Sequence, residues 1–346
     1  MESAIPEHLR QHRTQEGNAP AGFQPPNPAW VARFSPSVGQ VVMAYFGIQS
    51  WQVMDDAPFK ALRTHFASAG GPAHWECARY IDAQGYDTKI AIAYWDKPTD
   101  FNSWRANSGF DAWWQSPARL TEPYGYFLEV VSPTADRFET LRSSPEHPEG
   151  VARLESHLSG EIEEHAYWGS MRDRLPISQV DPLKSPTQPH EQPPTAAQGK
   201  RVVVPAHENL SLIRSGQDWS ATTGLERLLY LNEMQPILRA GMNFLRDEGQ
   251  AIGCLSCRYM TVLDEDGRSI EKTFGLAHFD NLANLELWAR THPTHLAIFG
   301  GFQKYVQDLN FKIELRLYHE VTVVPASGQY FEYVNCHHGT GLLGRG

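Results

Sequence analysis

The sequence predicts an α+β fold built from two similar halves, and three observations support this prediction. An apolar, strand-like run at 89–96 leads into a Trp-rich helical segment, and the run at 271–280 leads into a comparable one. Each is followed by another strand-like run with a similar ending, YFLEVVSP at 126–133 and LYHEVTVVP at 317–325. A polar, Pro-rich stretch at 178–200 separates the two segments. A repeat on the order of 100 residues long indicates a duplicated unit of strands and helices.

The boundaries of these halves follow from the composition along the chain. Residues 1–35 are polar and rich in proline, so we expect an N-terminal arm. Residues 36–177 are predicted to form a first ferredoxin-like half with connecting helices, and residues 178–200 a Pro-rich linker. Residues 201–346 are predicted to form a second ferredoxin-like half.

Two further runs have strand character, VVMAYFGIQ at 41–49 and GCLSCRYMTVLD at 253–264. We expect them to supply the first strand of each half. If the two halves pack their sheets together, the result is an α+β barrel.

Composition excludes several classes of protein. The 346 residues are 41% hydrophobic and 20% charged, and the formal net charge of −10 argues against nucleic acid or an anionic membrane as partner. No apolar run approaches the roughly 20 residues of a membrane helix, and the N-terminus lacks the apolar core of a secretory signal. Four irregularly spaced cysteines do not make a disulfide framework. These features favour a cytoplasmic protein.

One histidine leads a helical stripe. Pro293 is suited to a first helical turn, and His295, Phe299, Phe302 and Val306 then follow at helical spacing. We expect this stripe to face the interior. Pattern alone favours a hydrogen-bonded core histidine over a metal ligand at position 295.

A second histidine interrupts an aliphatic strand face. In the run 313–323, Leu317, His319 and Val321 point one way, whereas Tyr318 and Glu320 point the other. Burying an imidazole without a partner costs about 1–3 kcal/mol. His319 is therefore either paired with a neighbouring polar group or a catalytic acid/base in a cavity. If His295 lines the same cavity, one histidine could hold a metal cofactor while the other acts on a ligand across it.

Several long words of the sequence resemble a known family. The words are EHAYWGSMRDRLPISQ (164–179), LIRSGQDW (212–219), HPTHLAIF (292–299), LRLYHEV (315–321) and YFEYVNCHHGTGLL (330–343). Together with the N-terminal segments, they are similar to the haem-containing aldoxime dehydratases of nitrile-forming bacteria. The resemblance implies a haem-binding dimeric α+β barrel, with a homodimer as the assembly. It also implies haem b, active in the ferrous state; the absence of a CxxCH motif makes this haem non-covalent.

The resemblance also implies roles for individual residues. His295 would be the proximal ligand of the haem iron, and His319 the distal acid/base. Ser215 would hydrogen-bond the substrate hydroxyl, and Arg174 with Glu139 would tune the distal histidine. The connection between His295 and His319 is longer than in some relatives, which is expected to reshape the pocket and its substrate preference.

These residue types suit the dehydration of an aldoxime, R–CH=N–OH, to a nitrile. The ferrous iron would bind the oxime nitrogen, and His319 would protonate the departing hydroxyl and then accept the carbon-bound proton. The alternatives are a haem peroxidase-like enzyme or a haem-binding sensor on the same barrel. Ser215 favours the dehydratase, because a peroxidase has no evident need to bind a substrate hydroxyl.

Three other motifs are better explained by structure than by chemistry. GTGLLG at 339–344 matches a dinucleotide-binding glycine pattern, but the chain leaves no room for the helix that should follow it. Cys254 and Cys257 lie in a strand-like run without a second cysteine pair at zinc spacing. CHHG at 336–339 is best interpreted as a turn.

Overall fold

A computed structural model describes residues 1–51, 55–155, 157–186 and 196–344. Its centre is an 11-stranded sheet in the order β5-β10-β7-β9-β8-β2-β3-β1-β4-β11-β6, with neighbouring strands antiparallel. The strands are β1 Val42–Ser50, β2 His74–Ile81, β3 Asp87–Trp95, β4 Gly125–Val131, β5 Phe138–Arg142, β6 Arg201–Val204, β7 Leu210–Asp218, β8 Cys254–Leu263, β9 Ser269–Phe279, β10 Arg316–Val324 and β11 Gln329–Val334.

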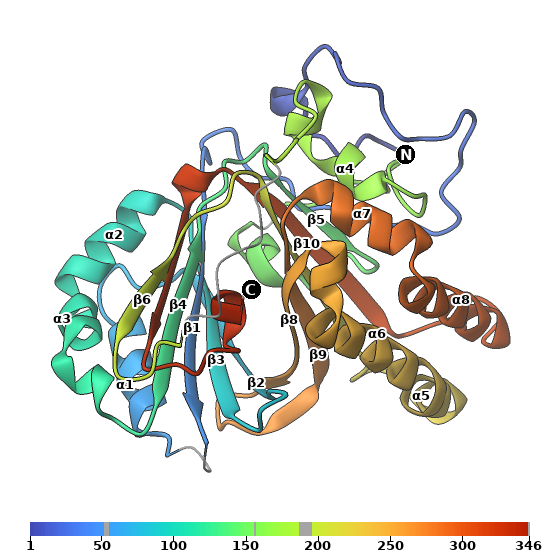
Figure 1. Cartoon of the computed structure of the whole chain (residues 1–346). Helices are drawn as coiled ribbons and strands as arrows, with labels where there is room; N and C mark the ends of the chain where they lie inside the picture. Colours follow the sequence, from blue (N-terminus) through green and yellow to red (C-terminus); the bar gives the residue numbers. More distant parts are fainter. Residues whose placement is uncertain (52–54, 156, 187–195, 345–346) are drawn as a thin grey trace.

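Helices cover the sheet from two sides. They are α1 Ala57–Phe66, α2 Pro98–Asn107, α3 Phe110–Gln115, α4 Ser170–Arg174, α5 Gly224–Leu229, α6 Gln235–Asp247, α7 Leu282–Thr291 and α8 Pro293–Asp308. Helices α1, α2 and α3 lie on the side of β1 and β4, and α5 to α8 lie on the opposite side near β9 and β10 (Figure 1). The predicted α+β class is confirmed, and its strands form one large antiparallel sheet.

Two groups of four strands have the same order within the sheet. One runs β2-β3-β1-β4, the other β8-β9-β7-β10, and they meet where Cys77–Arg79 of β2 pairs with Thr261–Leu263 of β8. The run 41–49 does supply the first strand of its group. The run 253–264 does not supply the first strand of the second group. It forms β8, which has the place in its group that β2 has in the other, whereas β7 is the first strand. Polar residues in β7 obscure its strand character in the sequence.

The outermost strands come from unexpected parts of the chain. β5, from the segment 36–177, pairs with β10, whereas β11 and β6, from the segment 201–346, extend the sheet beside β4. Each predicted half therefore extends the group of four strands formed by the other half, the first half by β5 and the second by β11 and β6.

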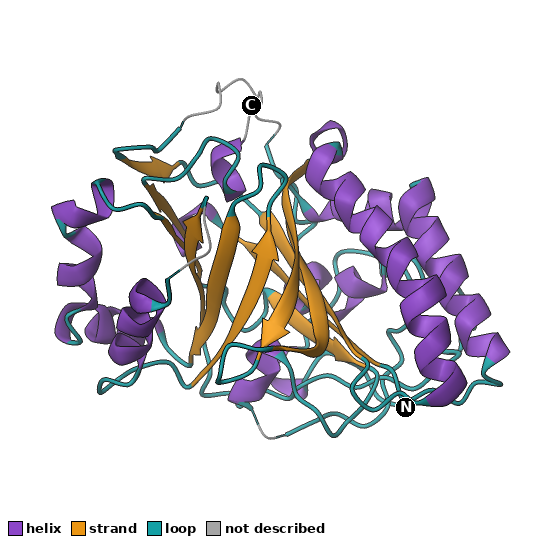
Figure 2. Ribbon diagram, turned by 90° about the horizontal axis from the view of Figure 1, so that it is seen from below, coloured by secondary structure: helices purple, strands orange, loops and turns teal. Residues whose placement is uncertain are grey.

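The main core lies between the two groups of strands. Tyr45 and Phe127 from one group and Met260, Phe274 and Tyr318 from the other belong to a single buried cluster. The opposite sheet faces pack on helices: α1 to α3 cover one group, and α6 to α8 cover the other. Figure 2 shows this arrangement, with the sheet between helices at both ends.

Irregular segments pack beside β5. Residues 1–40 contain one short 3-10 helix at Glu7–Leu9, and Ala4 and Val31 are buried against Ile162. In the predicted linker, Pro176–Gln179 forms a buried 3-10 turn, and residues 187–195 lie outside the described part. No helix in the described ranges is long and apolar enough to cross a membrane.

Candidate active site

The centre of the site is a pair of residues on adjacent strands. His319 of β10 lies directly opposite Ser215 of β7 in the antiparallel register. Directly paired residues project from the same face of a sheet, with Cβ atoms about 4.5–5.5 Å apart. Val321 continues this face and packs on the helices, whereas Tyr318 belongs to the core on the other side. The alternation predicted for this strand is confirmed.

The other neighbour of β10 carries the predicted carboxylate. Leu141 of β5 opposes His319, and Glu139 opposes Val321, so Glu139 lies on the same face. Arg174 of α4 binds Glu139 through two hydrogen bonds, Nε to Oε2 and Nη2 to Oε1, both 2.9 Å. Glu139 is 4% exposed and Arg174 3% exposed. Burial raises the pKa of Glu139, and the guanidinium opposes this rise.

Electrostatics keep His319 neutral in this structure. Burial and then, in decreasing order, the charges of Arg174, His295 and His165 together lower the pKa of His319 to about 3. These groups therefore face the same region as His319. A neutral imidazole there can accept a proton, whereas its protonated form is destabilised.

His295 lies one turn into α8, which begins at Pro293. Its ring donates a hydrogen bond to the Ala289 carbonyl, and burial lowers its pKa to about 4. Its Nδ1 is buried, and no described residue bonds it. Trp288 and Trp168 lie edge-on to the ring, with centroid distances of 4.7 and 6.0 Å. His295 is thus a neutral imidazole with one nitrogen available.

The neighbouring His292 is engaged elsewhere. It precedes the first turn of α8, its Nδ1 lies 2.9 Å from Thr294 Oγ1, and its ring stacks on Phe244 with a centroid distance of 4.1 Å. The Nδ1 of His292 is therefore occupied, whereas that of His295 has no partner among the described residues.

The predicted stripe of α8 is only partly interior. Val306 is buried, but Phe299 is 40% exposed and contacts Trp168, with centroids 5.2 Å apart. The expectation that the whole stripe faces the core was wrong for its first half. Helical periodicity identifies an apolar face but does not distinguish a close-packed core from the wall of a cavity.

A cavity of about 320 Å³ joins α8 to the sheet. Phe302 and Val306 of α8 line one side, and Leu141 and His319 line the other. His165 also lines this cavity. Opposite walls of one cavity thus come from the helix that carries His295 and from the strand that carries His319.

Two residues of the site were missed by sequence reasoning. His165 and Trp168 belong to the irregular segment before α4, where no periodicity marks a face. The one available signal was the word EHAYW, which is unusually rich in aromatic rings for a loop.

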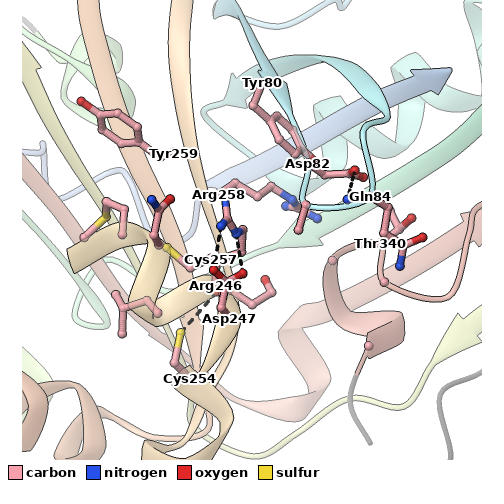
Figure 3. Close-up of a pocket in the computed structure, with 18 of the residues that line it drawn as sticks. Tyr80, Asp82, Gln84, Arg246, Asp247, Cys254, Cys257, Arg258, Tyr259 and Thr340 are labelled. Atoms are coloured by element: carbon pink, nitrogen blue, oxygen red, sulfur yellow. Dashed lines mark hydrogen bonds and ion pairs between the residues drawn. The ribbon is translucent and has the colours of Figure 1, made fainter. Parts of the chain in front are cut away.

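A second cleft of about 510 Å³ lies between β2, β8 and the C-terminal turn (Figure 3). Its arginines are already paired, Arg258 with Glu129 and Arg246 with Asp247. Cys254 and Cys257 line it as free, buried thiols, and burial raises the pKa of Cys257 to about 12. No group of potential metal ligands occurs among the described residues. The interpretation of these cysteines as buried structural residues agrees with this environment.

The C-terminal motifs also have structural roles. His337 of CHHG binds Asp82 at 2.7 Å, and the glycine-rich end forms a 3-10 turn at Gly341–Gly344.

Known proteins resemble the whole chain. A family model described as haem-containing dehydratase matches residues 44–342. An aliphatic aldoxime dehydratase from Rhodococcus globerulus is 43% identical over 348 residues, covering 99% of this chain and 98% of the relative. A phenylacetaldoxime dehydratase from Bacillus sp. (strain OxB-1) is 36% identical over 332 residues, covering 94% and 93%.

A solved structure has the same fold. The crystal structure of an aldoxime dehydratase in complex with butyraldoxime superposes with a TM-score of 0.91 at 42% identity and covers 99% of this chain and 96% of that one. With its sequence matched over most of its length and its fold shared throughout, the chain belongs to the haem-containing dehydratase family.

Proposed function

We propose that this chain is a haem-dependent aldoxime dehydratase, a lyase that converts R–CH=N–OH to R–C≡N and water with ferrous haem b. The cofactor is inferred from the family, and the substrate class from relatives named for aliphatic aldoximes and for phenylacetaldoxime. The observation that carries this proposal is the opposition of His319 and Ser215 on adjacent strands, where His319 lines the cavity bounded by α8.

The residues on α8 fit a haem. We assign His295 as the proximal ligand, because its Nδ1 is buried without a partner among the described residues. The exposed apolar side chains of Leu296 and Phe299 lie on the same helix and suit contact with a porphyrin face. When bound, ferrous haem supplies an open iron position for the oxime nitrogen and electron density for the N–O bond.

His319 is the proposed acid and base. Its neutral imidazole accepts the proton from the oxime carbon as the C≡N bond forms. The imidazolium so produced gives that proton to the hydroxyl oxygen, which leaves as water as the N–O bond breaks. The substrate has lost one water, and His319 is neutral again.

The remaining residues position and tune these transfers. Ser215 hydrogen-bonds the substrate hydroxyl and so holds it within reach of His319, its partner on the adjacent strand. The carboxylate of Glu139 offsets the charge of Arg174, which reduces the repulsion that imidazolium at His319 would otherwise meet.

The finer architecture belongs to the same proposal. The shared strand order supports two ferredoxin-like halves, 36–177 and 201–346, joined by the 178–200 linker, preceded by a 1–35 arm and packed as an α+β barrel. We further infer a homodimer from the family resemblance, and a cytoplasmic location from the four free thiols. Sedimentation at micromolar concentration tests the dimer.

The test of function is anaerobic. The purified protein is reduced with dithionite, its visible spectrum is recorded, and butyraldoxime or phenylacetaldoxime is added. We expect the Soret band to shift and nitrile to appear in the ferrous state only. Haem without nitrile from either oxime would favour the peroxidase-like or sensor alternative.

A variant pair tests the ligand. We expect His295→Ala to lose haem, because it removes the unpaired nitrogen, whereas His292→Gln retains a normal spectrum. The haem content of both proteins is measured as pyridine haemochrome. A normal haem spectrum in His295→Ala would refute the ligand assignment.

A further inference from the structure

The segment 163–168 bridges the two sides of the site. His165 lines the cavity together with His319, and its proximity disfavours protonation of His319 and so contributes to the lowered pKa of that residue. Three residues later, Trp168 packs on His295 and Phe299 of α8. A single loop therefore reaches both the proposed distal face and the proposed proximal face.

The N-terminal arm fixes this loop in place. The Glu164 carboxylate accepts hydrogen bonds from Ser3 Oγ at 2.8 Å and from the Ala4 amide at 2.7 Å. The Glu164 carbonyl accepts a bond of 2.9 Å from Arg174 Nη1. Ala166, directly after His165, has a φ of 66°, a left-handed conformation that is costly for a residue with a Cβ. The contacts around the loop hold His165 in a geometry that the local sequence would not adopt by itself.

The tautomer of His165 is fixed as well. Its Nδ1 lies 3.1 Å from the Asn27 carbonyl, which can only accept, so Nδ1 carries the hydrogen. Burial, followed by the charge of Arg174, lowers the pKa of His165 and keeps the ring neutral. Its Nε2 then has a lone pair, and no hydrogen bond to Nε2 is present in the described part of the chain. The result is a preorganised hydrogen-bond acceptor beside the cavity.

We propose that His165 is a further substrate-binding residue, whose Nε2 accepts a hydrogen bond from the hydroxyl group of the aldoxime. The proposal deepens the proposed function and rests on it. The oxime oxygen needs its own proton retained and a second one delivered before it can leave as water. An acceptor at Nε2 orients the O–H bond and leaves an oxygen lone pair for the proton from His319. His165 neither gains nor loses a proton in this role.

The test compares each oxime with its O-methyl ether, which lacks the donor hydrogen. The dissociation constants of butyraldoxime and O-methyl butyraldoxime are measured by stopped flow, from the Soret shift of the reduced holoenzyme before nitrile forms. Three variants are compared with the unchanged protein. His165→Phe keeps the bulk but removes the acceptor, His165→Gln keeps an acceptor, and His157→Gln alters an exposed histidine outside the site.

The unchanged protein should prefer the free oxime, and His165→Phe should reduce that preference roughly 3- to 10-fold, as expected for one hydrogen bond. His165→Gln should retain most of it, and His157→Gln all of it. An identical preference in the unchanged protein and in both His165 variants would overturn the proposal. If the unchanged protein forms no nitrile, the proposed function itself fails, which is a separate result.

Discussion

The two faces of the β7–β10 strand pair differ in how their polar groups are used. On one face His319 opposes Ser215, and within the described ranges no hydrogen bond satisfies either side chain. On the other face the adjacent residues Glu320 and Arg214 oppose each other. There Arg214 is fully buried, and it binds Tyr94 at 2.8 Å and Glu76.

The contacts on the second face hold the residues of the first face in position. The guanidinium of Arg214 lies 4.2 Å from the Phe274 ring centroid, and Tyr318 packs over Gly216 so closely that a Cβ there would lie 2.0 Å from its ring. These contacts allow one strand register. Because side chains alternate, a slip of one residue between the two strands would place His319 and Ser215 on opposite faces. The contacts of Arg214 and Tyr318 thus fix the register that places His319 and Ser215 side by side, where they can react.

The largest expected effect removes the reactive group. His319→Ala should retain haem and reduce nitrile formation about 10²- to 10⁴-fold, the usual contribution of a general acid–base group. Nitrile is quantified by gas chromatography under anaerobic conditions. Rates within twofold of the unchanged protein would remove His319 from the mechanism.

Removing the buried ion pair of Arg214 on the other face should instead lower the stability of the protein. Arg214→Met leaves buried carboxylates without their cation and should lower the free energy of unfolding by about 3–5 kcal/mol. Urea denaturation followed by tryptophan fluorescence measures the change. The matched control, Arg268→Met, alters an arginine that is 77% exposed and should stay within about 0.5 kcal/mol. Equal effects of the two substitutions would contradict the difference between the faces.

A smaller loss is expected at the partner of His319. Ser215→Ala should slow turnover roughly 10- to 100-fold with haem in place, the effect of losing one hydrogen bond to a group that develops charge. Ser211→Ala removes a hydroxyl from the same strand but opposite Val323, away from His319, and serves as the control. Unchanged rates for Ser215→Ala would exclude it from substrate binding.

The smallest effect concerns pH. His319 acts from its neutral form, so kcat/KM should fall as pH drops through its pKa, which is about 3 in this structure. Glu139→Gln removes the negative charge that offsets Arg174 and lowers the pKa of His319 further. The acid limb of the profile should therefore move to lower pH, by about 0.5–1 unit. A limb that stays in place or moves upward would show that Glu139 does not act on His319.

Sequence reasoning succeeded where periodicity carries the information. The alternation around His319 predicted its face, because a strand must alternate its side chains. It failed for the first half of α8, since Phe299 is as apolar on an exposed face as in a core. It missed His165, whose position depends on Asn27 and the N-terminal arm rather than on any local pattern. Sequence reasoning also could not predict that β5 pairs with β10 or that β11 and β6 extend the sheet beside β4, because long-range pairing leaves no local signal.

The register of β7 and β10 also bears on the order in which the protein assembles. His295 and its aromatic neighbour Trp288 lie on consecutive helices, so contacts local in the chain suffice to form that part of the pocket. The pairing of Ser215 with His319 closes a long loop, and such contacts form late because their entropic cost is high. A nascent chain would thus form the helix proposed to anchor haem before the proposed catalytic pair, and haem capture would precede competence for turnover.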